Sequence, residues 1–130
     1  MSRWARSALL AAAVVGGGSG WATAGKLDAE VEGVRAELRS EPERPGAGRE
    51  TSYVLRLLDS SGRPVTGAQT TLRGRMADGM SVVAPLRPAP EGGIYRGRVL
   101  FTMEGSWELT LRVDRQGKRF ELPLTESVGR

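Results

Sequence analysis

The stretch Trp107-Glu-Leu-Thr-Leu-Arg-Val113 decides the fold of this chain. A β-strand turns successive side chains to opposite faces. One face of this stretch holds only apolar residues, namely Trp107, Leu109, Leu111 and Val113. The other face is polar throughout. This period of two residues predicts a strand with one face buried in a core.

The same alternation recurs along the chain, between turn residues at short and even intervals. Turns such as Asp59-Ser-Ser-Gly62 separate the runs, because glycine accepts the positive φ that tight turns require. Pro85 and Pro88 indicate that the fourth run lies at a sheet edge. The predicted strands cover residues 34–39, 51–58, 68–76, 82–86, 95–101, 107–113 and 120–124. We therefore expect an all-β chain with a single seven-stranded antiparallel immunoglobulin-like β-sandwich.

The first 24 residues have the pattern of a signal peptide. Two arginines, Arg3 and Arg6, precede a short apolar run, and Ala22-Thr23-Ala24 forms a small-x-small site. We expect cleavage after Ala24, a lead-in over residues 25–33, the sandwich domain over 34–126 and a tail over 127–130. The protein is then periplasmic or secreted. Membrane contact is expected only if the leader is retained as an anchor.

The composition excludes several classes of active site. The chain contains neither cysteine nor histidine, so it has no disulfide, no Cys/His zinc site, no thiolate nucleophile and no histidine base. Its two lysines, Lys26 and Lys118, stand outside any Ser-x-x-Lys arrangement. The acidic residues are scattered singly. We expect no catalytic residues and no enzymatic activity.

The charge pattern argues against a nucleic-acid partner. Removing the leader takes the formal net charge from +4 to +2. The remaining arginines are interleaved with acids, as in the segment 35–44, which makes a mixed surface rather than a basic stripe.

Two segments resemble one protein family. The run Leu57-Leu-Asp-Ser-Ser-Gly-Arg-Pro-Val-Thr-Gly-Ala68 resembles the opening motif of the YtkA-like domain, which is also seen in FixH-family proteins. Gly93-Ile-Tyr95 and the segment 99–110 are similar to the second half of that domain. The likeness covers roughly residues 33–126. It implies an extracytoplasmic sandwich without enzymatic activity, and some relatives are linked to copper delivery and to assembly of cbb-type cytochrome oxidase.

The resemblance also draws attention to three methionines. Relatives carry a methionine-rich segment after the third strand, and the matching stretch here is Met76-Ala-Asp-Gly-Met80. Met103 lies in a later turn. The third and fifth strands run in the same direction in an up-and-down count, so these residues are expected at one pole, near Trp107. Three thioethers there would suit Cu(I), which soft ligands select.

The alternative for these methionines is core packing, with sulfur against the Trp107 ring. Two main functions therefore stay open. The first is a binding or assembly module that engages another envelope protein and holds no certain cofactor. The second is a periplasmic Cu(I)-binding protein or copper chaperone, linked to oxidase assembly, that uses Met76, Met80 and Met103. Carbohydrate or peptide recognition is a third class, supported only by exposed arginines.

Overall fold

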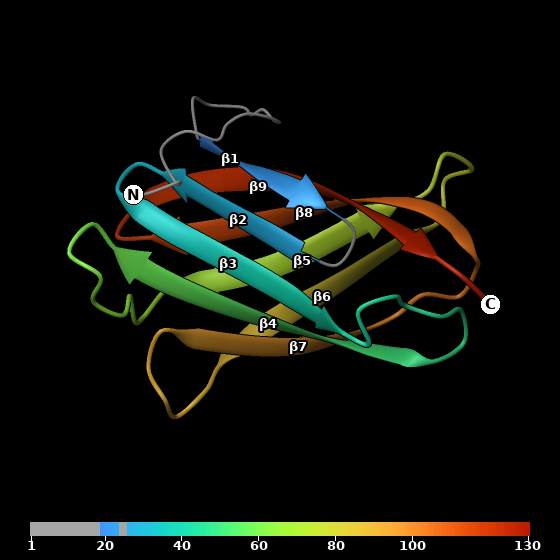
Figure 1. Cartoon of the computed structure of the whole chain (residues 1–130), viewed down its shortest axis with the longest axis horizontal. Coiled ribbons are helices and arrows are strands. Elements are labelled where there is room, and N and C mark those ends of the chain that lie inside the picture. Colours follow the sequence, from blue (N-terminus) through green and yellow to red (C-terminus); the bar gives the residue numbers. More distant parts are fainter. Residues whose placement is uncertain (1–18, 24–25) are drawn as a thin grey trace.

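A computed structural model describes residues 19–23 and 26–130 of the chain (Figure 1). The described residues form strands and turns and contain no helix, hence none long and apolar enough to cross a membrane. The strands are β1 (Ser19–Thr23), β2 (Lys26–Val31), β3 (Val34–Glu41), β4 (Glu50–Asp59), β5 (Gln69–Arg75), β6 (Ser81–Pro88), β7 (Ile94–Leu100), β8 (Gly105–Arg115) and β9 (Lys118–Val128).

The prediction of seven strands is wrong, because eight strands follow the expected leader. The additional strand is β2, within the segment expected to be a lead-in. Leu27, Ala29 and Val31 are buried and alternate with two acids, so the period of two was present in the sequence. A tight turn at Glu32 and Gly33, both with positive φ, then pairs β2 with β3. The seven predicted strands all form, as β3 to β9.

Part of the expected leader lies outside the described residues. Its positive end and the cleavage site after Ala24 fall there. Residues 19–23 are described as β1, which pairs antiparallel with β2 from Ser19↔Glu30 to Thr23↔Lys26.

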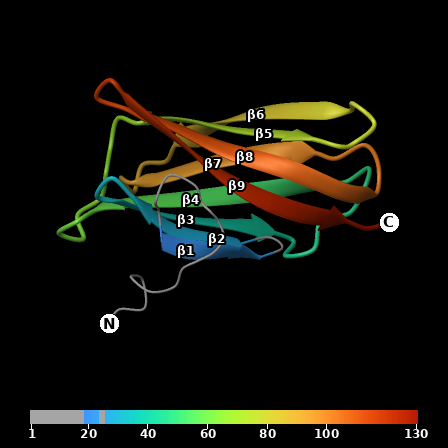
Figure 2. The ribbon, with the colours of Figure 1, turned by 90° about the horizontal axis from the view of Figure 1, so that it is seen from above.

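The strands form two layers that are joined along one side (Figure 2). The order β1-β2-β3-β4-β7-β6-β5-β8-β9 is continuous. Most of β6 pairs with β5, but its end crosses to β7 at Arg87 and Pro88. On the other side, β9 passes within 8 Å of β1 and β2 between Cα atoms. The fold is therefore an antiparallel sandwich that is nearly closed into a barrel.

The predicted edge character of the fourth strand is visible in β6. From Ser81 to Leu86 the strand pairs only with β5. Pro85 lies within this stretch and has no N–H to offer on the open side. The strand then approaches β7 closely, since a Cβ at Gly97 would lie 2.7 Å from the carbonyl oxygen of Pro85.

The core fills the space between the two layers. The inward residues predicted for β3, β4, β8 and β9 are buried, and Trp107, Tyr53 and Phe101 are each 0% exposed. The rings of Phe101 and Trp107 pack in a tilted arrangement, with centroids 5.2 Å apart. Tilted aromatic pairs of this kind add to the stabilisation from burial alone.

Candidate functional site

The three methionines lie at one end of the sandwich, which we call the methionine pole and define by Met76, Met80, Met103 and Trp107. The β5–β6 turn holds Met76 and Met80, and the β7–β8 loop holds Met103. Both loops lie at the right-hand end in Figure 1, because β5 and β7 run in the same direction. The C-terminal end of β9 lies there too.

The β5–β6 turn has a fixed backbone. The N–H of Met76 donates to the carbonyl of Met80 (2.8 Å), and the N–H of Gly79 donates to the carbonyl of Met76 (3.0 Å). The carboxylate of Asp78 accepts from the N–H of Met80 (3.0 Å). Gly79 adopts φ 99°, which favours glycine. Met80, 38% exposed, is thus presented to solvent from an ordered turn.

Met103 is held by its backbone rather than by its side chain. Its carbonyl accepts a hydrogen bond from Nε1 of Trp107 (3.0 Å), while its side chain is 44% exposed. The indole is fully buried and therefore needs a partner for its N–H. The bond joins the β7–β8 loop to the core and leaves the Met103 thioether accessible.

The side chain of Met76 extends from the β5–β6 turn to the start of β8. It is partly buried and packs against the core. A Cβ at Gly105 would lie 2.7 Å from Cε of Met76, so the methionine crosses the backbone of β8 where that glycine leaves room. The backbone of Met76 is therefore hydrogen-bonded to that of Met80. Its side chain lies against Gly105, two residues after Met103. Its half-buried position also agrees with the packing alternative.

The donor set at this pole is chemically soft. No group of three or more Asp, Glu, His or Cys side chains that could hold a metal occurs in the described part of the chain. Thioether sulfur requires no deprotonation and selects Cu(I) over harder ions.

A groove of about 840 Å³ opens next to the methionine pole, between the β3–β4 loop and residues 126–130. It is tied to the β7–β8 loop, because the N–H of Gly48 donates to the carbonyl of Phe101 (2.8 Å). Arg130 lies 3.7 Å from Glu104, measured from Nε to Oε2. Arg44, Arg49 and Arg130 line the groove. No pattern in the sequence indicated this groove.

Glu126 lines this groove and forms a buried polar pair with Tyr53, which the sequence pattern did not indicate. The phenol of Tyr53 donates to Oε1 of Glu126 at 2.7 Å, and both side chains are 0% exposed. Burial, followed by the charge of Glu126, raises the pKa of the Tyr53 phenol far above its ordinary range. The available signal was Glu126 itself, since it interrupts the apolar alternation Phe120, Leu122, Leu124 and Val128.

The opposite pole is built by the first motif of the family resemblance and by Gly93-Ile-Tyr95, whereas the segment 99–110 begins at the methionine pole. Asp59 accepts hydrogen bonds from the N–H groups of Ser61 and Arg63 (2.8 and 3.0 Å), and the bond from Arg63 is the main cause that lowers its pKa. The Tyr95 hydroxyl donates to the carbonyl of Val65 (2.8 Å) and accepts from the N–H of Ala68 (3.2 Å). These contacts give the first motif and Tyr95 a structural role at the pole opposite the methionines.

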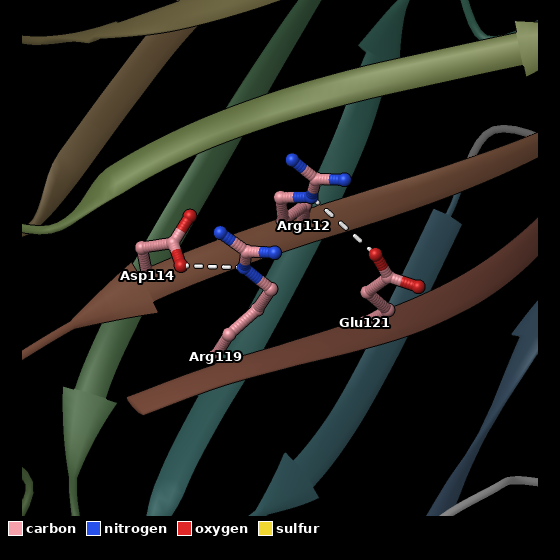
Figure 3. A network of polar contacts seen from close by, with 4 residues as sticks. All are labelled: Arg112, Asp114, Arg119 and Glu121. Carbon is pink, nitrogen blue, oxygen red and sulfur yellow. Dashed lines mark hydrogen bonds and ion pairs between the residues drawn. The ribbon is translucent and has the colours of Figure 1, made fainter. Parts of the chain in front are cut away.

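Charges on the outer face of β8 and β9 pair with one another. Figure 3 shows Arg112 directed at Glu121 (3.3 Å) and Arg119 at Asp114 (2.7 Å) across the two strands. The hydrogen bond that Arg119 donates to Asp114 is the main cause that raises the pKa of Arg119. This part of the surface is therefore balanced in charge.

Comparison with known proteins gives a family and a fold. The sequence profile of the YtkA-like family matches residues 28–112. No curated protein matches the chain in sequence. Among solved structures, the Lin-41 filamin domain superposes with a TM-score of 0.53 at 24% identity, over 67% of this chain and 83% of that domain. A DUF4785 family protein from Legionella pneumophila gives 0.53 at 14% identity, over 75% of this chain and 29% of that one.

Proposed function

The chain belongs to the YtkA-like family, and from that premise we propose that it is a non-catalytic binding or assembly module of the cell envelope. Its expected partner is another envelope protein. The observation that carries the proposal is the exposure of large apolar side chains at one end of the sandwich. Met80, Met103 and Leu100 are 38%, 44% and 49% exposed, and all three belong to or adjoin the loops of the methionine pole.

Exposed apolar side chains that gather in one place are a common mark of an interaction site. Here they are held on ordered turns, so binding requires little loss of conformational freedom. The outer face of β8 and β9 is a weaker candidate for a binding surface. Its charges already pair with one another, and solvent-exposed ion pairs contribute little free energy.

Site-specific photo-cross-linking in the native envelope tests this proposal. A photoreactive residue replaces Met103 in one variant and Ser61, at the opposite pole, in the control. We expect Met103 to give a reproducible cross-linked band to a single envelope protein, with none from Ser61. Equal labelling from both poles, or no specific band from Met103, would contradict a partner at the methionine pole.

Export is part of the same proposal. Residues 1–24 would direct the chain out of the cytoplasm and be removed after Ala24, giving a periplasmic or secreted protein. Fractionation followed by intact mass measurement checks this directly. The expected mass is that of a chain beginning at Gly25, and a full-length mass would contradict removal.

A second candidate function is Cu(I) binding at Met76, Met80 and Met103. It is favoured by the exposed thioethers of Met80 and Met103 on two loops that both adjoin Met76. Thioether ligands suit Cu(I), also in an oxidising compartment. The chain contains no cysteine that could supply a thiolate ligand instead. This site would make the protein a copper carrier or chaperone, and the family resemblance makes an oxidase the expected recipient.

Anaerobic titration with a colorimetric Cu(I) competitor tests the second function. We expect the mature protein to withdraw one equivalent of Cu(I), and the Met76→Leu/Met80→Leu/Met103→Leu variant to withdraw none. Leucine conserves the approximate volume, so the fold should persist. Circular dichroism of the variant serves as the control. Equal withdrawal by both proteins would exclude these methionines as ligands.

A further inference from the structure

The open edge of the first sheet is covered by a strand from the expected leader. β1 pairs with β2 over five residues, and all five lie within residues 1–24. In Figure 2, β1 continues the layer formed by β2, β3 and β4. If the leader is removed as proposed above, β2 becomes the edge of that layer. The inference below rests on this removal.

The edge of β2 lacks two of the devices that protect a sheet edge, namely proline and a bulge, although it is short and carries three charged residues. Unpaired N–H and C=O groups on an edge strand are a template for pairing with another strand. The segment Lys26–Val31 contains no proline, and its ladder with β3 runs without a bulge. By contrast, the edges of β6 and β9 carry Pro85 and Pro123.

We propose that in the processed protein β2 pairs antiparallel with β2 of a second copy, centred on Asp28. A strand added at this edge must turn its apolar residues to the same side of the sheet as those of β2, so that they stay buried. A register shift of one residue would move all of them to the solvent side. Only registers that place odd-numbered residues opposite odd-numbered residues satisfy this for Leu27, Ala29 and Val31, which are the buried ones.

Charge then selects among the allowed registers. Centring on Asp28 gives five residue pairs and places Lys26 opposite Glu30 of the second copy, twice by symmetry. Centring on Ala29 places Asp28 opposite Glu30, which repels. Centring on Leu27 leaves only three pairs. Opposite charges directly across a ladder stabilise it, and like charges destabilise it.

The centre of the chosen register brings two copies of Asp28 together. Each has Nε of Arg35 at 4.0 Å from its carboxylate, on the neighbouring strand of the same layer. The same guanidinium also pairs with Glu37 (3.0 Å), which lies directly opposite Asp28 on β3, so it offsets only part of the repulsion at the twofold axis. The contact is isologous, so it closes as a dimer and does not propagate into a fibre.

β1 would then act as a temporary cover. In the unprocessed chain it satisfies the β2 edge and blocks the dimer, and leader removal exposes the edge after export. The full-length protein is expected to be monomeric and the processed protein dimeric at high concentration. A five-residue pairing is short, so the dimer should be weak.

Charge exchange at the two ends of β2 tests the register. In the processed protein, Lys26→Glu and Glu30→Lys should each weaken dimerisation about tenfold or more, measured by sedimentation equilibrium. An equimolar mixture of the two variants should form a heterodimer as tight as the unaltered homodimer, because both cross-strand pairs become complementary. Single variants that dimerise as the parent does would overturn the proposal.

Disulfide cross-linking gives a second readout. Because the chain contains no cysteine, an introduced cysteine is the only thiol that can react. Asp28→Cys should form an intermolecular disulfide across the twofold axis on mild oxidation. Glu30→Cys is the matched control, because in this register its two copies lie about 13 Å apart along the strands, too far for a disulfide. Equal cross-linking of both variants would also overturn the register.

Failure of leader removal is distinguishable from failure of the dimer. If the mass of the exported chain shows that residues 1–24 remain, the full-length protein is tested with Gly20→Pro/Trp21→Pro, because one of two successive residues directs its N–H toward β2. These prolines prevent β1 from pairing and free the β2 edge. Dimerisation of that variant supports the interface without processing, and a monomer at millimolar concentration overturns it.

Discussion

The phenol of Tyr53 on β4 donates a 2.7 Å hydrogen bond to the carboxylate of Glu126 on β9, across the interior of the sandwich. The two residues are 73 positions apart in sequence and belong to different layers. Both side chains are completely buried. A polar contact in this position joins the two layers next to the arginine-lined groove.

Removing one member of this pair should destabilise the protein. Tyr53→Phe deletes the donor and leaves a buried carboxylate without it, so we expect a loss of about 1.5–3 kcal/mol in the free energy of unfolding. Urea denaturation of the variant and the parent measures it. Tyr53→Phe/Glu126→Leu, which replaces both polar groups, should recover part of the loss. A double variant that is less stable than the single one would contradict this account.

Alkaline pH should weaken the fold through the same tyrosine. Burial, with the charge of Glu126 second, raises the pKa of Tyr53 in the folded protein far above its usual value, which is about 10 in an unfolded chain. The folded state therefore favours the protonated phenol. Its contribution is fully present below about pH 10 and decreases above it, by about 1.4 kcal/mol per pH unit.

The comparison with Tyr53→Phe isolates that contribution. We expect the free energy of unfolding of the parent to fall more steeply between pH 10 and 11 than that of the variant. Absorbance of tyrosinate near 295 nm should show Tyr53 ionising only as the protein unfolds. Parallel pH profiles for the two proteins would contradict the assignment.

The close approach of β5 to β8 depends on Gly74. A Cβ built there would collide with Cδ2 of Leu109 and lie 3.3 Å from Cγ2 of Val82. Because Leu109 is buried, we expect Gly74→Ala to lower the stability by about 1–3 kcal/mol through overpacking. Thermal unfolding measures the effect. Gly74→Ala/Leu109→Val should be more stable than Gly74→Ala alone, and a less stable double variant would exclude the steric cause.

Trp107 should matter to the methionine pole through its N–H. Trp107→Phe removes the hydrogen bond to the Met103 carbonyl and part of a buried side chain, so we expect a loss of about 2–4 kcal/mol in chemical denaturation. Met103→Leu should be nearly neutral, because the acceptor is a backbone carbonyl. Similar losses in both variants would mean that the Met103 side chain itself packs in the core.

The alternating stretches identify the strands reliably because each strand buries only one face. Val34, Ala36 and Leu38 in β3 are all buried, as are Phe120, Leu122 and Leu124 in β9. β2 was missed although Leu27, Ala29 and Val31 follow the same rule. Its run is short and directly follows an apparent leader, so the pattern alone did not separate a strand from a lead-in.

The location of the methionines was partly predictable. Strand direction placed Met76, Met80 and Met103 at one pole, and that is where their loops lie. The groove and the Tyr53–Glu126 pair were not predictable, because both depend on contacts between β9 and residues more than 70 positions earlier. Local periodicity carries no information on which distant strands face one another.

The sequence by itself therefore determined the strand-rich fold, the inward face of almost every strand and the absence of cysteine and histidine chemistry. These follow from residue identity and from the period of two. Only the tertiary structure decided the eighth strand, the crossing of β6 between layers and the buried link of Tyr53 with Glu126. The physical reason is that those features depend on the pairing of distant segments, which packing selects and no single stretch encodes.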